Sequence, residues 1–175
     1  MNSLEKDMAN FKSWDEAAEH VVASLEWEVK TGRIDEKEFD AVERFISTWI
    51  LGLQANDEFA KADTPLATTM ITHAGILALQ HIRDTDIPYS HDDMVRLLIR
   101  KQHDYGHDNI NNFGIIGIGV RVCDKIARIR NLRGRDADGV AEPLADSYFD
   151  LIGYAAIAQM YHHGWFQLEL ERDIK

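Results

Sequence analysis

Residues Leu144–Met160 (LADSYFDLIGYAAIAQM) give the clearest indication of the fold class. Wound as a helix, this stretch is apolar on nearly every side, and a helix that is apolar all round is a buried one. Pro143 immediately before it suits a first helical position, and His163-Gly164 suits the end. We therefore expect a helix from Pro143 to about His163 at the centre of a bundle.

The remainder of the chain also predicts helices. It holds only three prolines and no strand-like alternation longer than a few residues. The fold class that follows is all-α, a helical bundle in one domain over residues 1–175. Helices are expected from the capping box Ser13-Trp-Asp-Glu16 to Lys30, from Asp35 to about Gln54, after Pro65, from about Ser90 to Lys101, and from Val120 to Leu132.

Two glycine-containing segments flank the Val120–Leu132 helix. The run Gly114–Gly119 (GIIGIG) fits either an extended segment or the start of that helix, and the pattern does not choose between them. Gly134–Gly139 (GRDADG) is expected to be a turn or a mobile surface loop.

Charge is distributed unevenly along the chain. The formal net charge is −11, which argues against a general DNA or RNA binder, because such proteins need a positive face. Residues 96–135 are the exception, with nine basic and three acidic side chains. A local cationic patch in an acidic protein suits a small polyanion such as a nucleotide phosphate.

Other bulk properties exclude several classes of protein. No apolar run approaches the roughly 18 residues that a membrane span needs, and no secretory signal is visible at the N-terminus. Cys123 stands alone, which excludes an internal disulfide and a cysteine-built zinc site. We expect a cytoplasmic protein without membrane or nucleic-acid partners.

Two aspartates interrupt the apolar helix. Asp146 and Asp150 are four residues apart, so their side chains project from one side, about 40° apart around the axis. A carboxylate in apolar surroundings needs a cation. For Asp150 we expect a metal-ligand or ion-pair role, whereas Asp146, in the first turn, also fits a simple preference for the helix dipole.

The preceding helix carries Arg121, Asp124, Lys125 and Arg128 along one side. In an isolated helix these residues fit a solvated face with Asp124 as the internal partner. The short connection to the next helix predicts antiparallel neighbours, so that Asp124 can face Asp146 and Asp150. Three such oxygen donors suit Mg²⁺ or Mn²⁺.

The most polar connection of the chain is Lys101–Gly114 (KQHDYGHDNINNFG). Its composition is that of an ordinary turn. Its lysine, carboxylates and amides also suit a ligand site, so both interpretations stay open at this point.

Four segments together resemble a known family. "KQHDYG", "NINNFG", "GVRVCDKIARIRNL" and "EPLADSYFDLIGYA", within residues 95–160, are similar to the phage nucleotide-modification-associated (MazG-like) family of all-α nucleoside triphosphate pyrophosphohydrolases. Residues 1–90 show no recognised motif. The resemblance implies a helical bundle, often a dimer or tetramer, that uses Mg²⁺ to split a (deoxy)nucleoside triphosphate into the monophosphate and pyrophosphate.

The resemblance also implies roles for individual residues. The Glu-Glu-x-x-Glu and Glu-x-x-Asp metal motifs of the better-known MazG enzymes are replaced here by Asp124 and by Asp146-x-x-x-Asp150. The implied site therefore has three sets of residues: metal ligands Asp124, Asp146 and Asp150, substrate-binding Lys101, Tyr105, Asn109, Asn112, Lys125 and Arg128, and a water-activating base that is either Asp104 or Glu142.

Phage members of this kind adjust nucleotide pools, which makes dGTP a candidate substrate and the host cytoplasm the expected location. The departure from the glutamate-rich motifs favours an alternative, a non-catalytic protein that binds and sequesters nucleotides. A third interpretation is a scaffold whose Trp14, Trp27 and Trp49 form a partner surface, although tryptophans are more often part of the core.

Overall fold

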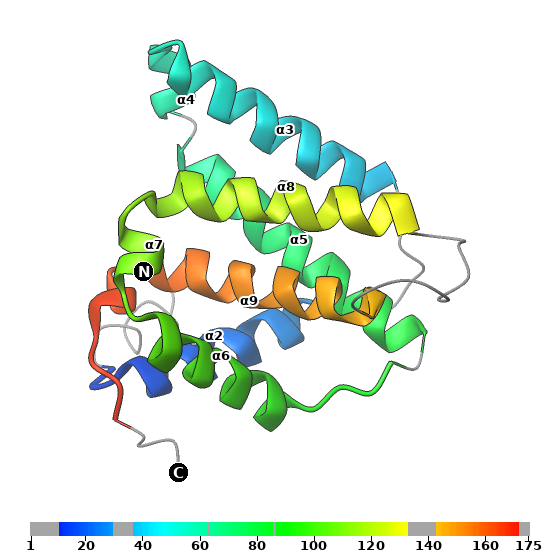
Figure 1. The fold of residues 1–175 in the computed structure, drawn as a ribbon, viewed down its shortest axis with the longest axis vertical. Coiled ribbons are helices and arrows are strands. Elements are labelled where there is room, and N and C mark those ends of the chain that lie inside the picture. Colours follow the sequence, from blue (N-terminus) through cyan, green and yellow to red (C-terminus); the bar gives the residue numbers. More distant parts are fainter. Residues whose placement is uncertain (1–10, 30–36, 63, 86, 133–142, 172–175) are drawn as a thin grey trace.

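The computed structural model describes residues 11–29, 37–62, 64–85, 87–132 and 143–171. Within these ranges it contains helices and no strand, which confirms the all-α prediction (Figure 1). The α-helices are α2 (Trp14–Glu28), α3 (Lys37–Gln54), α4 (Glu58–Ala62), α5 (Thr64–Asp84), α6 (His91–Tyr105), α7 (Asp108–Asn111), α8 (Gly114–Leu132) and α9 (Leu144–His162), and a 3₁₀ helix, η1, covers Trp165–Gln167.

Helix α9 occupies the centre of the bundle, as its composition predicts. It packs most extensively against α5, lies antiparallel beside α8, and also contacts α2, α6 and η1 (Figure 1). Tyr148, Leu151, Ile152 and Met160 are at most 1% exposed. Surrounding helices therefore cover α9 on several sides, which explains why so little of it is polar.

Serine caps fix the start of two helices. The Ser13 hydroxyl accepts a hydrogen bond from the Glu16 backbone N–H at the start of α2, at 3.3 Å. Ser90 does the same for the Asp93 N–H at the start of α6, at 3.4 Å. These bonds satisfy N–H groups that have no partner within the helix, and they confirm both predicted starts.

The segment Lys101–Gly114 is more helical than the sequence indicates. Helix α6 continues to Tyr105, so the prediction that it ends at Lys101 and passes into a polar connection is wrong. Gly106 ends the helix at a φ of 64°, a conformation that glycine adopts without strain. The short helix α7 and the start of α8 follow, so Lys101 and Tyr105 both extend from a helix.

The glycine-spaced run Gly114–Gly119 is the first part of α8 rather than an extended segment. Gly119 allows α3 to approach, since a Cβ atom there would lie 3.0 Å from Ile46 Cγ2. Gly114 has a φ of 54°, and a Cβ atom there would lie 2.9 Å from the Tyr161 hydroxyl. Tertiary contacts thus explain both glycines.

Helices α5 and α9 cross at an especially short distance. A Cβ atom added to Gly75 would lie 2.3 Å from the Ala155 Cβ and 3.2 Å from the Leu151 carbonyl oxygen. Beside the crossing, the Gln159 amide donates a hydrogen bond to the Thr72 hydroxyl, at 2.7 Å. Only small side chains fit at this contact.

The three tryptophans that the sequence offers as a partner surface have different environments. Trp14 and Trp49 are 1% and 4% exposed and belong to the core, and the Trp49 indole N–H donates to the Ala60 carbonyl of α4 at 2.9 Å. Trp27 is 88% exposed. A shared tryptophan surface is therefore wrong for two of the three residues.

The segment that follows α9 packs against the start of α2. The Trp14 backbone N–H donates to the Glu169 carbonyl at 2.9 Å, and the Glu171 N–H donates to the Asp15 carboxylate at 3.0 Å. His107 Nε2 lies 3.1 Å from the Leu168 carbonyl oxygen. This segment thus connects α2 with α7.

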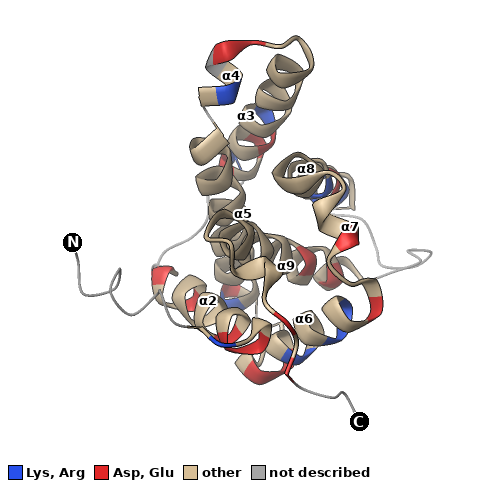
Figure 2. Cartoon of the chain, turned by 90° about the vertical axis from the view of Figure 1, so that its left-hand side faces the viewer, with Lys and Arg blue, Asp and Glu red and all other residues tan. Residues whose placement is uncertain are grey.

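Basic side chains occur on both α6 and α8, the two helices of the basic segment (Figure 2). Within the described ranges, no helix has the length and apolarity that crossing a membrane would require. The turn expected at Gly134–Gly139 lies outside the described residues.

Candidate functional site

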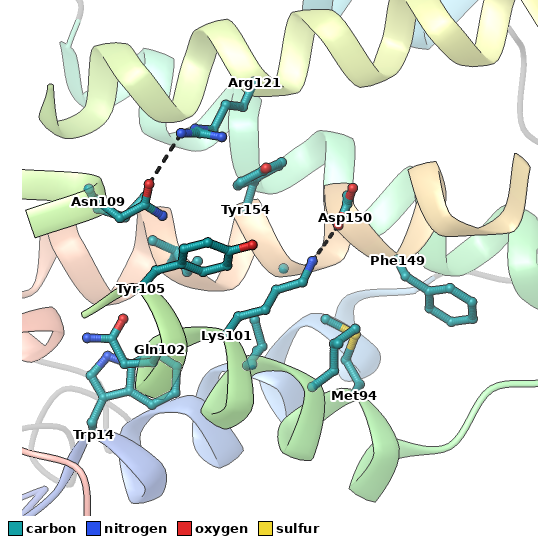
Figure 3. A pocket seen from close by; sticks show the side chains of 15 residues that line it. Trp14, Met94, Lys101, Gln102, Tyr105, Asn109, Arg121, Phe149, Asp150 and Tyr154 are labelled. Carbon is teal, nitrogen blue, oxygen red and sulfur yellow. Dashed lines mark hydrogen bonds and ion pairs between the residues drawn. The ribbon is translucent and has the colours of Figure 1, made fainter. Parts of the chain in front are cut away.

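A cavity of about 300 Å³ lies between α6 and α9 and is bordered by α2, α7 and α8 (Figure 3). Apolar side chains such as Leu98 and Ile157 form part of its wall. Its volume is at the lower end of the range typical of small-molecule sites. Its polar lining includes Lys101, Gln102, Tyr105, Asn109, Arg121, Asp150 and Tyr154.

Asp150 joins two lysines from two other helices. Its Oδ1 lies 2.6 Å from the Lys101 Nζ of α6, and its Oδ2 lies 2.9 Å from the Lys125 Nζ of α8. The Asp150 and Lys125 side chains are 18% and 19% exposed, whereas Lys101 is 42% exposed. One carboxylate thus holds two ammonium groups close together, and Figure 3 shows the pair that it forms with Lys101 at the cavity.

The ionisation of these groups follows from their contacts. Burial raises the pKa of Asp150, but the hydrogen bonds and charges of Lys101 and Lys125 outweigh burial, so its pKa lies below the ordinary value. Burial lowers the pKa of Lys125, and Asp150 more than reverses this effect, so its pKa lies above the ordinary value. At neutral pH both groups are therefore charged.

Further polar side chains line the α7 and α8 side of the cavity. The Arg121 guanidinium donates to the Asn109 side-chain oxygen at 3.3 Å. Tyr105 is 64% exposed and lies at the cavity beside Lys101, and Tyr154 also lines it (Figure 3). Lys101, Lys125 and Arg121 outnumber Asp150 and the exposed Asp124, whose charge also acts on Lys125. This excess of positive charge suits an anionic ligand.

The structure brings five of the predicted site residues together. Lys101, Tyr105, Asn109 and Asp150 line the cavity, and Lys125 is linked to them through its ion pair with Asp150. For Asp150 the ion-pair interpretation is the one observed. These contacts connect residues up to 49 positions apart in the chain.

Three other predicted residues point elsewhere. Asp104 is exposed, and its carboxylate lies 3.3 Å from His103 Nδ1. Asn112 is exposed at the end of α7. Arg128 donates to the Ser147 hydroxyl and, at 3.5 Å, to the Pro143 carbonyl, so its guanidinium contacts the first turn of α9 rather than lining the cavity. Glu142 lies outside the described residues.

The predicted metal ligands differ in their exposure to solvent. Asp124 and Asp146 are exposed on α8 and α9, whereas Asp150 is largely buried between two lysines. In the ranges that the structure covers, no group of three or more His, Cys, Asp or Glu side chains is placed to hold a metal ion. The role of these three aspartates as metal ligands therefore stays a prediction from the sequence.

The sequence reasoning missed several residues of the cavity. Arg121 and Tyr154 had a usable signal, because each is four residues from a predicted site residue, Lys125 and Asp150, on the same helix face. Gln102 adjoins Lys101 but lacks a charge. Nothing in the sequence indicates that Trp14 belongs to the site, because it is far from the other site residues in the chain and has the pattern of an ordinary core residue.

Comparison of the chain with protein families, curated proteins and solved structures found no match. Membership of the MazG-like family thus stays a prediction from the sequence. The geometry of the cavity between α6 and α9 is therefore the main evidence on function.

Proposed function

We propose that this protein binds a nucleoside triphosphate in the cavity between α6 and α9. The observation that carries the proposal is the pair of lysines, Lys101 and Lys125, held on one carboxylate at the cavity. Together with Arg121, these lysines outnumber Asp150 and the nearby Asp124, so the cluster has a net positive charge. Phosphate oxygens are the natural ligands of such a cluster.

The remaining polar residues suit the other parts of a nucleotide. Tyr105 presents a ring that is 64% exposed at the cavity, and Asn109 presents an amide beside Arg121. An aromatic ring and an amide are groups that stack on or hydrogen bond to a base or sugar. The cavity therefore offers both cationic and neutral contacts.

A second candidate function is hydrolysis of the bound nucleotide to the monophosphate and pyrophosphate, with dGTP among the candidate substrates. It is favoured by the sequence resemblance and by the position of Asp150 at the cavity. Catalysis of phosphoryl transfer depends largely on neutralising phosphate charge, which the two lysines can do. Binding without turnover is favoured by the exposed positions of Asp124 and Asp146.

One experiment separates these two functions. The purified chain is incubated with each of the eight common nucleoside triphosphates in the presence of Mg²⁺, and binding and pyrophosphate release are measured together. Binding without release supports sequestering, whereas release that a chelator abolishes supports metal-dependent hydrolysis. Absence of binding to all eight nucleotides contradicts both.

We also propose that the chain forms a homo-oligomer in the cytoplasm. An exposed apolar stripe supports the first part: Phe113, directly before α8, and Ile116 and Val120, within it, are 73%, 40% and 53% exposed and follow one another at helical spacing. The mass of the particle in solution, measured for the natural chain and for Phe113→Glu, tests it. A single monomeric mass for the natural chain contradicts the oligomer.

A further inference from the structure

Two buried side chains at the cavity each have a nitrogen atom without a hydrogen-bond partner in the described part of the protein. Gln102 is 6% exposed and Trp14 is 1% exposed, and both line the cavity. Among the described residues, no acceptor pairs with the Gln102 Nε2 or with the Trp14 Nε1. Both side chains lie on the same side of the cavity, away from Phe149 (Figure 3).

The excess of donors does not depend on how the glutamine amide is turned. An indole has one N–H and no acceptor, and a glutamine amide has two N–H groups and one oxygen. A half-turn of the amide only exchanges its oxygen and nitrogen. In either orientation three N–H groups accompany one oxygen, so this part of the cavity needs an acceptor from outside the pair.

The bundle holds both side chains in place. The Trp14 backbone N–H is bonded to the Glu169 carbonyl, and its ring meets the Phe166 ring edge to face at 6.5 Å. Gln102 lies in the last turn of α6, where its carbonyl accepts a hydrogen bond from the Gly106 N–H at 2.8 Å. Buried donors without acceptors are rare in folded proteins, and each calls for an explanation such as a bound ligand or an ordered water.

The chemistry of these groups points to a neutral acceptor. Neither the amide nor the indole carries a charge, and Leu98 and Ile110 of the surrounding wall are apolar. Phosphate oxygens would instead be drawn to Lys101, the neighbour of Gln102 in the chain. A carbonyl oxygen or ring nitrogen of a planar heterocycle can accept from the neutral donors and bury its apolar faces here.

We propose that Gln102 and Trp14 form the subsite that recognises the base of the bound nucleotide, by donating to a ring nitrogen or carbonyl oxygen. This inference rests on the proposed nucleotide-binding function. It assigns the two ends of the ligand to different parts of one cavity, with the phosphates at the lysine pair and the base at Gln102 and Trp14.

The test compares Gln102→Met with the natural chain, using two probes. One probe is the nucleoside triphosphate that binds most tightly of the eight common ones, and the other is inorganic tripolyphosphate, which has no base. We expect the variant to bind the nucleotide about five- to tenfold more weakly, the effect of losing one hydrogen bond, and to bind tripolyphosphate as before.

A second measurement excludes a merely structural role. Because Gln102→Met removes a buried donor that has no partner, we expect the melting temperature of the ligand-free variant to stay the same or to rise. Trp14→Phe removes the indole N–H and keeps an aromatic ring. It should likewise weaken binding of the nucleotide and leave binding of tripolyphosphate unchanged. If the melting temperature falls and the affinity for both probes falls equally, the proposed base subsite is wrong.

The remaining outcomes distinguish failure of the base subsite from failure of the proposed nucleotide-binding function. One outcome is that the natural chain binds tripolyphosphate as tightly as any of the nucleotides. This result would support the phosphate site at the lysines and contradict the base subsite. Unchanged nucleotide affinity in both variants also overturns the subsite. If the natural chain binds neither probe, the proposed function fails and the base subsite fails with it.

Discussion

The two sides of α9 that face α5 and α6 are built differently. Toward α5, Ala155 meets Gly75 so closely that a Cβ atom on the glycine would lie 2.3 Å away. Toward α6, Gly153 and Asp150 line the cavity, and a Cβ atom on Gly153 would lie 3.3 Å from its nearest neighbour, Leu98 Cδ2. One helix thus carries a close-packed contact and a polar cavity within a few residues.

This difference shows how stability and function are divided in the bundle. The α5 side has small side chains in close contact, which is the arrangement that stabilises a core. The α6 side contains a shared carboxylate, two lysines and donors without partners, an arrangement that folding alone does not favour. Substitutions on the two sides should therefore change different properties.

The largest effect is expected for Gly75→Ala on the close-packed side. The added methyl group meets Ala155 and the Leu151 backbone, so the helices must move apart. Overpacking of this kind destabilises by roughly 1–3 kcal/mol, and we expect a loss of about 2 kcal/mol in the free energy of unfolding. Urea denaturation measures this loss. Unchanged stability would show that α5 and α9 can accept a methyl group at their contact without cost.

The next effect is expected for Lys101→Ala on the cavity side. The Lys101 side chain is 42% exposed, so the melting temperature should change little, whereas loss of a charged contact to phosphate should weaken nucleotide binding about tenfold, or roughly 1.4 kcal/mol. Arg100→Ala is the matched control, because Arg100 is the exposed neighbouring cation on α6 and does not line this cavity. Equal weakening in both variants would indicate a general charge effect.

A smaller effect is expected for Asp150→Asn, and it should depend on pH. The lowered pKa of Asp150 means that its ion pairs stabilise the folded state above the unfolded-state value, near 3.8, and that this contribution is lost as the pH falls through the lower folded-state pKa. At pH 7 the variant should be less stable by about 1 kcal/mol. Unfolding curves from pH 7 down to pH 2 should converge with those of the natural chain, and a constant difference would contradict the ion-pair role.

The smallest effect on stability is expected for Gly153→Ala, the counterpart of Gly75→Ala. Its methyl group meets only the ends of the Leu98 and Met94 side chains, at 3.3 and 3.5 Å, and alanine favours the helix over glycine by up to about 1 kcal/mol. We expect a gain of about 0.5 kcal/mol in denaturation, together with weaker nucleotide binding because the methyl group enters the cavity. A loss as large as that of Gly75→Ala would remove the distinction between the two sides.

Much of the fold was predictable because its signals are local. Ser13 and Ser90 cap the helices that follow them, and the apolar composition of Leu144–Met160 requires burial wherever the helix lies. The boundary at Lys101 was predicted wrongly because histidine, aspartate and tyrosine favour a loop by composition, yet α6 continues to Tyr105.

The candidate site was predictable only in part. Asp150 needs a cation because it sits in an apolar helix, and the basic segment supplied the candidates, so an ion pair was foreseeable. Asp124 is exposed on α8, and its predicted place beside Asp150 as a metal ligand stays a prediction. The rotation of one helix against its neighbour decides which side chains meet, and periodicity within a single helix does not contain it.

The amino-acid sequence by itself determined a helical bundle with an apolar helix at its centre and a basic segment beside it, because helix propensity, capping and burial act over a few residues. Only the tertiary structure decided three contacts: Lys101 and Lys125 share Asp150, Gly75 packs directly against Ala155, and Trp14 and Gln102 line the same cavity. Such contacts join residues far apart in the chain, and they form only when the packing of all the helices fixes their relative rotation and separation.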